Sequence, residues 1–254
     1  MVIVITGIIG AIVAVFIRAP VEGYIDTVAR AELTEAGDAA LRRIARDVQA
    51  ALPNSLRTTS PASTACFEFL PTVGGGRYRV AQTSAGAGNI LDFTAADNAF
   101  DFLAYSGTGL AAGQQVVIYN LGITGADAYA GINRAAVGGV ADSTITLSVD
   151  TQFPFRSPGN RFQVIPNTSV IYSCAAGTLW RSTRAINAAA LAECPNAGTP
   201  LVTNVNCAAS SFSYLPAASQ RNGLLTMILV LTQPGARGNE TIQLYQEVHV
   251  NNVP

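Results

Sequence analysis

The chain opens on an uninterrupted apolar run, because residues 1–17 carry no charge and Arg18 is the first charged side chain. As a helix the run extends roughly 26 Å at about 1.5 Å per residue, slightly less than the ~30 Å hydrocarbon core of a bilayer. It is apolar on every face and lies at a terminus, where burial in a globule is unusual. The pattern favours a membrane-inserting helix. A secretory signal peptide fits less well, since no basic residue precedes the run and Ala19 with Pro20 forms a poor cleavage site.

The pattern then becomes amphipathic. Apolar residues recur at spacings of three and four, which places them along one face of a helix. They are Ile25, Val28, Ala29, Ala36, Ala40, Leu41, Ile44, Val48, Ala51 and Leu52, and Leu33 falls slightly off their stripe. Pro20 either starts this segment or kinks a longer helix, and Pro53 ends it. If both parts are continuous, the helix is about 75 Å long, so its N-terminal half must leave the globule.

Two acid–base pairs are spaced for ion pairing on the solvent side of this helix. Asp26 precedes Arg30 by four residues, and Asp38 precedes Arg42 by four residues. On an exposed helix face such pairs contribute about 0.3 kcal/mol each. We expect both pairs to form.

From Cys66 onward the apolar pattern has a period of two, which is typical of strands. The candidate strands are 66–73, 77–82, 115–121, 144–149, 161–165, 169–173, 178–181, 211–215, 224–232 and 240–250. Three glycines at 74–76 predict a hairpin tip between the first two strands. The predicted class is α+β, with a long N-terminal α-helix, transmembrane and then amphipathic, packed on an antiparallel β-rich globular domain. Its expected parts are residues 1–19, 20–53 and 54–254.

Composition excludes several classes of function. Apolar residues make up 49% of the chain and charged residues 12%, which excludes intrinsic disorder. The net charge of -1 supplies no field for a polyanion, so no nucleic-acid binding is predicted. All 15 basic residues are arginines, which excludes lysine-dependent chemistry. A single histidine leaves one donor for histidine-based catalysis or metal binding, so neither an enzyme nor a cofactor is predicted.

One acidic cluster lies outside the helix. Its members are Asp92, Asp97, Asn98 and Asp101. Oxygen ligands at this spacing could hold Ca²⁺, but the segment lacks the D-x-[DN]-x-[DN]-G loop of calcium-binding helix pairs. Solvated loop carboxylates are therefore the favoured interpretation, with calcium as the alternative.

The histidine lies in the last predicted strand. His249 shares one face of that strand with Glu247 and Tyr245, where a general base could be imagined. The favoured interpretation is an exposed polar face, since no nucleophile motif accompanies His249 and its neighbours alternate regularly. A membrane-tethered exported enzyme would need His249 or the acidic cluster to be catalytic, and no motif supports either. The glycine-rich segments 74–76 and 107–113 lack the lysine or following helix of a nucleotide-binding loop.

The four cysteines, Cys66, Cys174, Cys194 and Cys207, are candidates for disulfides. No C-x-x-C pair occurs and no histidine accompanies them, which favours disulfides over zinc. Three pairings are possible, and the spacing does not choose among them. A cysteine-bridged body rich in Gly, Ser, Thr and Asn indicates an exported protein.

The order of an apolar helix, its amphipathic continuation and a β-rich domain with cysteines resembles a type IV pilin. The run MVIVITGIIGAIVAVFI looks like the interior of a class III prepilin segment. The body segments that resemble minor pilins of mannose-sensitive haemagglutinin (MSHA) pili, of the MshO type, are FEFLPTVGGGRYR, VVIYNLGITGADAYAGINRAA, FPFRSPGNRFQV, GTLWR, SFSYLP and EVHVNNVP. The family's basic leader, cleavage site and early glutamate do not precede this run, so the resemblance implies a mature N-terminus a few residues upstream of Met1.

The resemblance implies a minor pilin that takes part in initiating pilus assembly or in the tip complex, without catalysis. The alternatives are a minor pseudopilin of type II secretion, related to the J-type, and a tip adhesin whose binding loop is the stretch from Tyr119 to Asn133. The implied partners are other major and minor pilins, the inner-membrane assembly platform and the bilayer. The implied location is the inner membrane with a single span and a periplasmic domain, and then the extracellular pilus.

The resemblance also assigns the apolar helix a role in assembly. The residues expected to contact lipid and later neighbouring helices are Val2, Ile3, Ile5, Gly7, Ile8, Ile9, Gly10, Ile12, Val13, Val15, Phe16 and Ile17. Gly7, Gly10 and Ala11 are expected to permit close approach of other helices.

Overall fold

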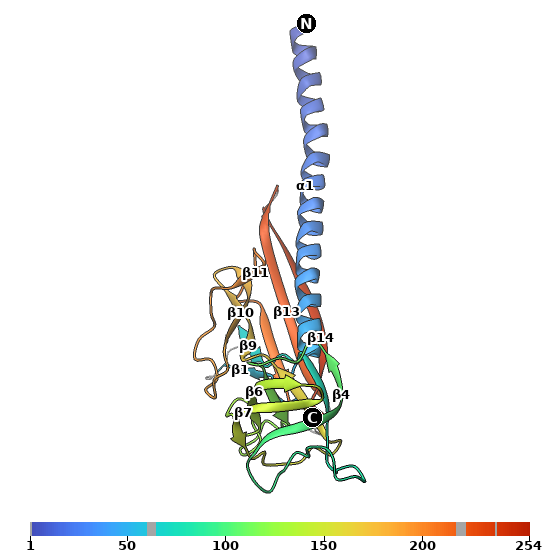
Figure 1. Ribbon diagram of the computed structural model, residues 1–254. Coiled ribbons are helices and arrows are strands. Elements are labelled where there is room, and N and C mark those ends of the chain that lie inside the picture. Colours follow the sequence, from blue (N-terminus) through green and yellow to red (C-terminus); the bar gives the residue numbers. More distant parts are fainter. Residues whose placement is uncertain (1, 60–64, 217–221, 237) are drawn as a thin grey trace.

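The computed structural model describes residues 2–59, 65–216, 222–236 and 238–254, and it contains one long helix on a β-rich body (Figure 1). The helix, α1 (Val2–Gln49), runs without interruption through Pro20. Its N-terminal half projects beyond the strands, and its C-terminal half lies against them (Figure 1). The strands form a three-stranded sheet, a five-stranded sheet and a closed barrel, and all their pairings are antiparallel. The predicted α+β class is confirmed.

The three-stranded sheet lies alongside the helix. Its order is β12 (Ser211–Leu215), β13 (Asn222–Gly235) and β14 (Gly238–Asn251). The β13–β14 hairpin is paired along its whole length and confirms the last two predicted strands, each extended beyond its predicted ends. Gly238, at its turn, has a φ of 136°, which a residue without a side chain adopts readily.

One face of α1 packs on this hairpin. Its buried side chains are Ala29, Leu33, Ala40, Leu41, Ile44 and Val48. Gly37 marks the closest approach, because a Cβ there would lie 2.4 Å from Cδ1 of Leu244 and 2.9 Å from Cδ1 of Leu231. The predicted stripe is wrong at several positions: Leu33 is buried with it, whereas Ile25 and Ala36 are exposed. Ala51 and Leu52 are buried as expected, but they lie beyond the end of the helix at Gln49. The glycine lets the helix approach at 37 and so turns 33 rather than 36 towards the sheet.

The five-stranded sheet completes the core around the C-terminal half of α1. Its order is β1 (Arg57–Thr58), β2 (Cys66–Phe69), β9 (Thr168–Ala175), β10 (Thr178–Ala185) and β11 (Thr199–Val202). Phe67 of β2 lies at its centre, with ring centroids 5.5 Å from Tyr172 and 5.3 Å from Phe212. These rings join the helix, the five-stranded sheet and the three-stranded sheet in one apolar core.

The barrel has its own core. Its order is β3 (Gly74–Tyr78), β4 (Asp97–Gly107), β7 (Thr144–Thr151), β6 (Arg134–Ala141), β5 (Gln115–Ile118) and β8 (Arg161–Ile165). Phe100 and Phe162 meet edge to face inside it, with centroids 5.8 Å apart. Buried aliphatic side chains from the other strands fill the remaining space.

The glycines at 74–76 do not form the predicted hairpin tip. They belong to strand β3, which pairs with β4 on one side and β8 on the other, while β2 lies in a different sheet. A Cβ on Gly76 would lie 2.2 Å from the carbonyl oxygen of Ala104 and 2.7 Å from the ring of Phe162. The glycines are thus needed for close packing inside the barrel rather than for a turn.

The two disulfides are Cys66–Cys194 and Cys174–Cys207. Each joins a strand of the five-stranded sheet to the chain that follows β10, across sequence separations of 128 and 33 residues. This selects one of the three pairings that the spacing left open. Because disulfides persist in oxidising environments, they indicate a compartment other than the cytoplasm.

Candidate functional site

The N-terminal half of α1 is the main candidate functional surface, because its large apolar side chains are exposed. They are Ile3, Val4, Ile5, Ile12, Val13, Phe16, Ile17, Val21, Tyr24 and Ile25. Ile3 is 86% exposed and Phe16 is 75% exposed. A Cβ placed on Gly7 or Gly10 would meet no atom within 4 Å. Contiguous exposed apolar surface of this kind marks an interaction site.

Some of the predicted assembly residues cannot be placed on this surface. The side chains of Val2, Ile8, Ile9, Ala11 and Val15 lie outside the described residues. In the part of the chain that is described, no helix has the combined length and apolar character needed to cross a membrane.

The tip of the β13–β14 hairpin marks where the helix leaves the globular domain. Asp26 accepts a hydrogen bond from the backbone N–H of Ala236 at 2.7 Å. Arg30 forms an ion pair with Glu240, also at 2.7 Å. The predicted Asp26–Arg30 pair is therefore wrong, because both side chains turn to the hairpin instead of to each other.

The second predicted pair on the helix does form. Asp38 and Arg42 lie 3.2 Å apart on the exposed side of the docked half of α1. In the described part of the chain, no strand residue pairs with either side chain, so the i, i+4 pair forms here although it does not form at the hairpin tip.

The other end of the helix is fixed to the five-stranded sheet through Asp47. Its carboxylate accepts hydrogen bonds from the Tyr172 hydroxyl at 2.7 Å and from the Arg181 guanidinium at 2.9 Å. Burial, together with the hydrogen bond to Asp47, raises the pKa of Tyr172. The helix is thus held at both ends of its docked half.

Glu68 is the most buried carboxylate of the body and holds the strands beneath the helix together. It is 1% exposed and receives Arg57 at 3.0 Å, Arg184 at 2.7 Å and the Ser169 hydroxyl at 2.5 Å. Burial raises the pKa of Glu68, but the bonds from Arg184 and Ser169 and the charge of Arg57 outweigh it, so the pKa lies below its ordinary value of 4.5. The guanidinium of Arg57 also lies 3.4 Å from the ring centroid of Tyr129.

The three aspartates among the calcium candidates have protein partners of their own. Three of them, Asp97, Asn98 and Asp101, lie in β4 and Asp92 precedes it. Asp92 accepts hydrogen bonds from the N–H and hydroxyl of Thr94, each at 2.7 Å. Asp101 pairs with Arg79 at 3.2 Å and accepts a 2.7 Å hydrogen bond from Thr144. Among the described residues, no three His, Cys, Asp or Glu side chains are grouped so that they could hold a metal ion.

His249 lies on the exposed face of β14, and the predicted alternation is correct. Ile242, Leu244, Val248 and Val250 form the opposite face, which packs on the core. On the outer face the Tyr245 hydroxyl donates a hydrogen bond to Glu247. His249 itself is exposed beyond this pair.

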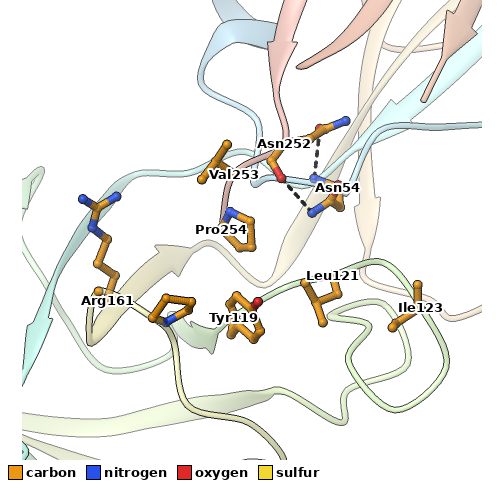
Figure 2. Close-up of a pocket in the computed structure, with 10 residues that line it drawn as sticks. Asn54, Tyr119, Leu121, Ile123, Arg161, Asn252, Val253 and Pro254 are labelled. Atoms are coloured by element: carbon orange, nitrogen blue, oxygen red, sulfur yellow. Dashed lines mark hydrogen bonds between the residues drawn. The ribbon is translucent and has the colours of Figure 1, made fainter. Parts of the chain in front are cut away.

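A cavity of about 590 Å³ lies beside the C-terminal residues, far from the projecting helix (Figures 1 and 2). Its lining is Asn54, Tyr119, Leu121, Ile123, Pro158, Gly159, Arg161, Asn252, Val253 and Pro254. Asn54, which follows α1, donates to Asn252 through its backbone N–H at 3.2 Å and its side-chain amide at 3.1 Å. In Figure 2, Arg161 lies at one end of the cavity, Leu121 and Ile123 lie at the other, and Tyr119 lies between them.

Sequence reasoning found only part of this cavity. The stretch from Tyr119 to Asn133, a candidate binding loop from its sequence, supplies one wall. The rest comes from Asn54, which follows α1, from the residues at the start of β8 and from the C-terminal residues, which are far apart in the sequence. Only the closure of the barrel beside the helix end brings them together, so no local motif could have signalled them.

Comparisons with protein-family models, with curated proteins and with solved structures found no match to this chain.

Proposed function

We propose that this protein is a minor pilin of an MSHA-type type IV pilus, acting without catalysis in assembly initiation or in the tip complex. The observation that carries the proposal is the exposed apolar half of α1. The hairpin contacts at Asp26 and Arg30 end the part that the globular domain covers. Apolar surface beyond that point is stable only where lipid or other apolar protein surrounds it.

In the filament, other pilin helices would cover this surface. The exposed side chains point to several sides of the helix, which fits the centre of a bundle better than a two-helix contact. Gly7 and Gly10 have open space around them, so a neighbouring backbone can approach closely. Other major and minor pilins are therefore the partners that this helix suits.

Before assembly, the same segment would anchor the protein in the inner membrane by a single short span. The run of residues 1–17 is roughly 26 Å long as a helix, and local thinning of the bilayer accommodates a deficit of a few ångströms. Arg18 ends the run and pairs with Glu22 at 2.5 Å, which suits the polar boundary. The disulfide-bonded body would then lie in the periplasm until the inner-membrane assembly platform extracts the subunit from the bilayer.

The resemblance of the body segments supports the MSHA assignment and a role at initiation or at the tip. A minor pseudopilin of type II secretion would need the same projecting helix, so the helix does not separate the two. The identity of the co-assembling subunits distinguishes a minor pilin from a minor pseudopilin.

The test is to isolate the full chain, with a C-terminal tag, from a detergent extract of cells carrying its whole operon. We expect other pilin-like subunits to be recovered with it. Recovery with the subunits of a secretion system would favour the pseudopilin alternative, and recovery of the monomer alone would contradict both.

Two variants show whether the helix carries the interaction. Phe16→Asp places a charge on the projecting helix, and Val149→Asp makes the same type of change on β7, where Val149 is 72% exposed. We expect Phe16→Asp to abolish co-isolation while the disulfide-bonded body stays folded, and Val149→Asp to leave co-isolation intact. Equal loss or equal retention in both variants would contradict the assignment to the helix.

A further inference from the structure

Tyr119, in the middle of the cavity, is held in a backbone conformation that bulky residues rarely adopt. Its φ is 51°, in the left-handed region. Asn54 and Asn160, which line or adjoin the same cavity, also have positive φ values of 59° and 53°. Asparagine tolerates this region, but tyrosine does not, so a strained tyrosine is retained only where its surroundings enforce it.

Two buried asparagines enforce the Tyr119 conformation. The side-chain amide of Asn120 donates to the carbonyl of Pro53 at 2.7 Å and its oxygen accepts from Ala128 N–H at 2.9 Å. The amide of Asn133 donates to the Asn120 side chain at 3.3 Å and to the carbonyl of Tyr119 at 3.4 Å. Both asparagines are at most 1% exposed. This network fixes Tyr119 on the cavity wall, which is the arrangement expected of a preorganised binding residue.

Arg161, at one end of the cavity, carries a charge that the protein does not neutralise. It stands directly opposite Arg77 in the β3–β8 pairing, so two guanidinium groups share one face of the barrel. Within the described ranges, neither arginine forms an ion pair. Like charges directly opposite each other across two strands destabilise the sheet. A bound anion would remove that repulsion.

Half of the residues that line the cavity have apolar side chains. Leu121, Ile123, Val253 and the two prolines are apolar. The side chain of Asn252 is already paired, since its oxygen accepts from Asn54 and its amide donates to Tyr214 at 2.9 Å. The lining therefore suits an apolar body better than a sugar, whose many hydroxyls would lack partners.

We propose that this cavity binds a small organic anion, with its carboxylate on Arg161 and its apolar body over Tyr119 against Leu121 and Ile123. A guanidinium accepts a carboxylate through two parallel hydrogen bonds, and the volume is within the range of small-molecule sites. The inference does not depend on the pilin assignment, because every residue that carries it belongs to the body.

The test is isothermal titration calorimetry on the full chain in detergent micelles, with protein-free micelles as the blank. The probes are 4-phenylbutyrate, its neutral analogue 4-phenylbutanamide, and glucuronate, which has a carboxylate on a polar body. We expect 4-phenylbutyrate to bind at least about tenfold more tightly than either of the others, because one charge-assisted contact is worth about that factor. Equal affinity for the amide, tighter binding of glucuronate, or no binding of 4-phenylbutyrate would overturn the proposal.

Variants distinguish a binding role from a structural one. Arg161→Gln should lower the affinity for 4-phenylbutyrate to that for the amide. The melting temperature should not fall, because the substitution also removes the repulsion between Arg161 and Arg77. Arg42→Gln, on the helix, is the matched control and should leave affinity unchanged. Ile123→Asn should lower the affinity for the acid and for the amide by the same factor. Ile132 is also exposed but lies outside the lining, so Ile132→Asn should lower neither affinity. Unchanged affinity in Arg161→Gln would overturn the proposal.

Discussion

At the scale of single residues, the buried carboxylate of Glu68 joins several strands of the five-stranded sheet. Its carboxylate balances Arg57 and Arg184, so β1, β2 and β10 meet around one buried charge. Both arginine side chains are about a fifth to a quarter exposed, at 19% and 26%, which keeps part of their hydration. The carboxylate itself is almost completely removed from water, so its charge is stabilised by these partners.

Glu68→Gln should lower the free energy of unfolding by about 3 kcal/mol, because removing one partner leaves the arginines uncompensated in a mostly buried site. The measurement is chemical denaturation of the full chain with both disulfides intact. Glu35→Gln, at an exposed helix position, is the control and should change the free energy by less than about 0.5 kcal/mol. Equal effects would show that the Glu68 network contributes nothing to stability.

Glu68 also predicts a pH dependence. Because its pKa in the folded protein is lowered from 4.5, its stabilising contribution is complete above that pH and is lost as the pH falls through the folded-state value. The free energy of unfolding should therefore decline below about pH 4.5 more steeply in the wild type than in Glu68→Gln. Parallel pH profiles for the two proteins would contradict the direction of the shift.

At the scale of elements, the helix–hairpin contact depends on Gly37. Helical periodicity alone located the docked half of α1 and most of its buried side chains. It put Leu33 off the stripe and Ala36 on it, because an ideal period cannot show where two backbones come closest. The β13–β14 hairpin decides that point, through Leu231 and Leu244 against Gly37.

Gly37→Leu should lower the free energy of unfolding by about 2 kcal/mol, because the added side chain must displace two leucines in a packed interface. Ala36→Leu adds a similar volume at an exposed position and should have an effect within about 0.5 kcal/mol. Thermal melts of both variants decide the question. If the two variants lose the same stability, the helix does not pack as described.

The two disulfides differ in the length of chain that they close. In the chain-entropy account, removing Cys66–Cys194 should cost about 1 kcal/mol more than removing Cys174–Cys207, because the first closes 128 residues and the second 33. Paired Cys→Ala variants measured by denaturation compare the two. A larger loss from the shorter loop would contradict this order.

At the scale of the whole molecule, local sequence patterns predict individual helices and strands better than they predict how these elements are arranged in space. The apolar run, the amphipathic half-helix and the last hairpin are local patterns, and each was found where it was expected. The barrel was not foreseen, because Gly74, Gly75 and Gly76 resemble a turn until β4 and β8 flank them. The distal cavity was missed for the same reason: Asn54 and Arg161 meet only after the barrel closes beside the helix end.

We propose that apolar helices of other subunits cover the projecting half of α1. The most direct measurement is photo-crosslinking in cells from an unnatural amino acid at position 16, with the same probe at position 149 as control, followed by mass spectrometry of the adducts. We expect the probe at 16 to crosslink to the apolar N-terminal helix of another pilin-like subunit and the probe at 149 not to. Crosslinks from position 16 only to the chain's own body would contradict it.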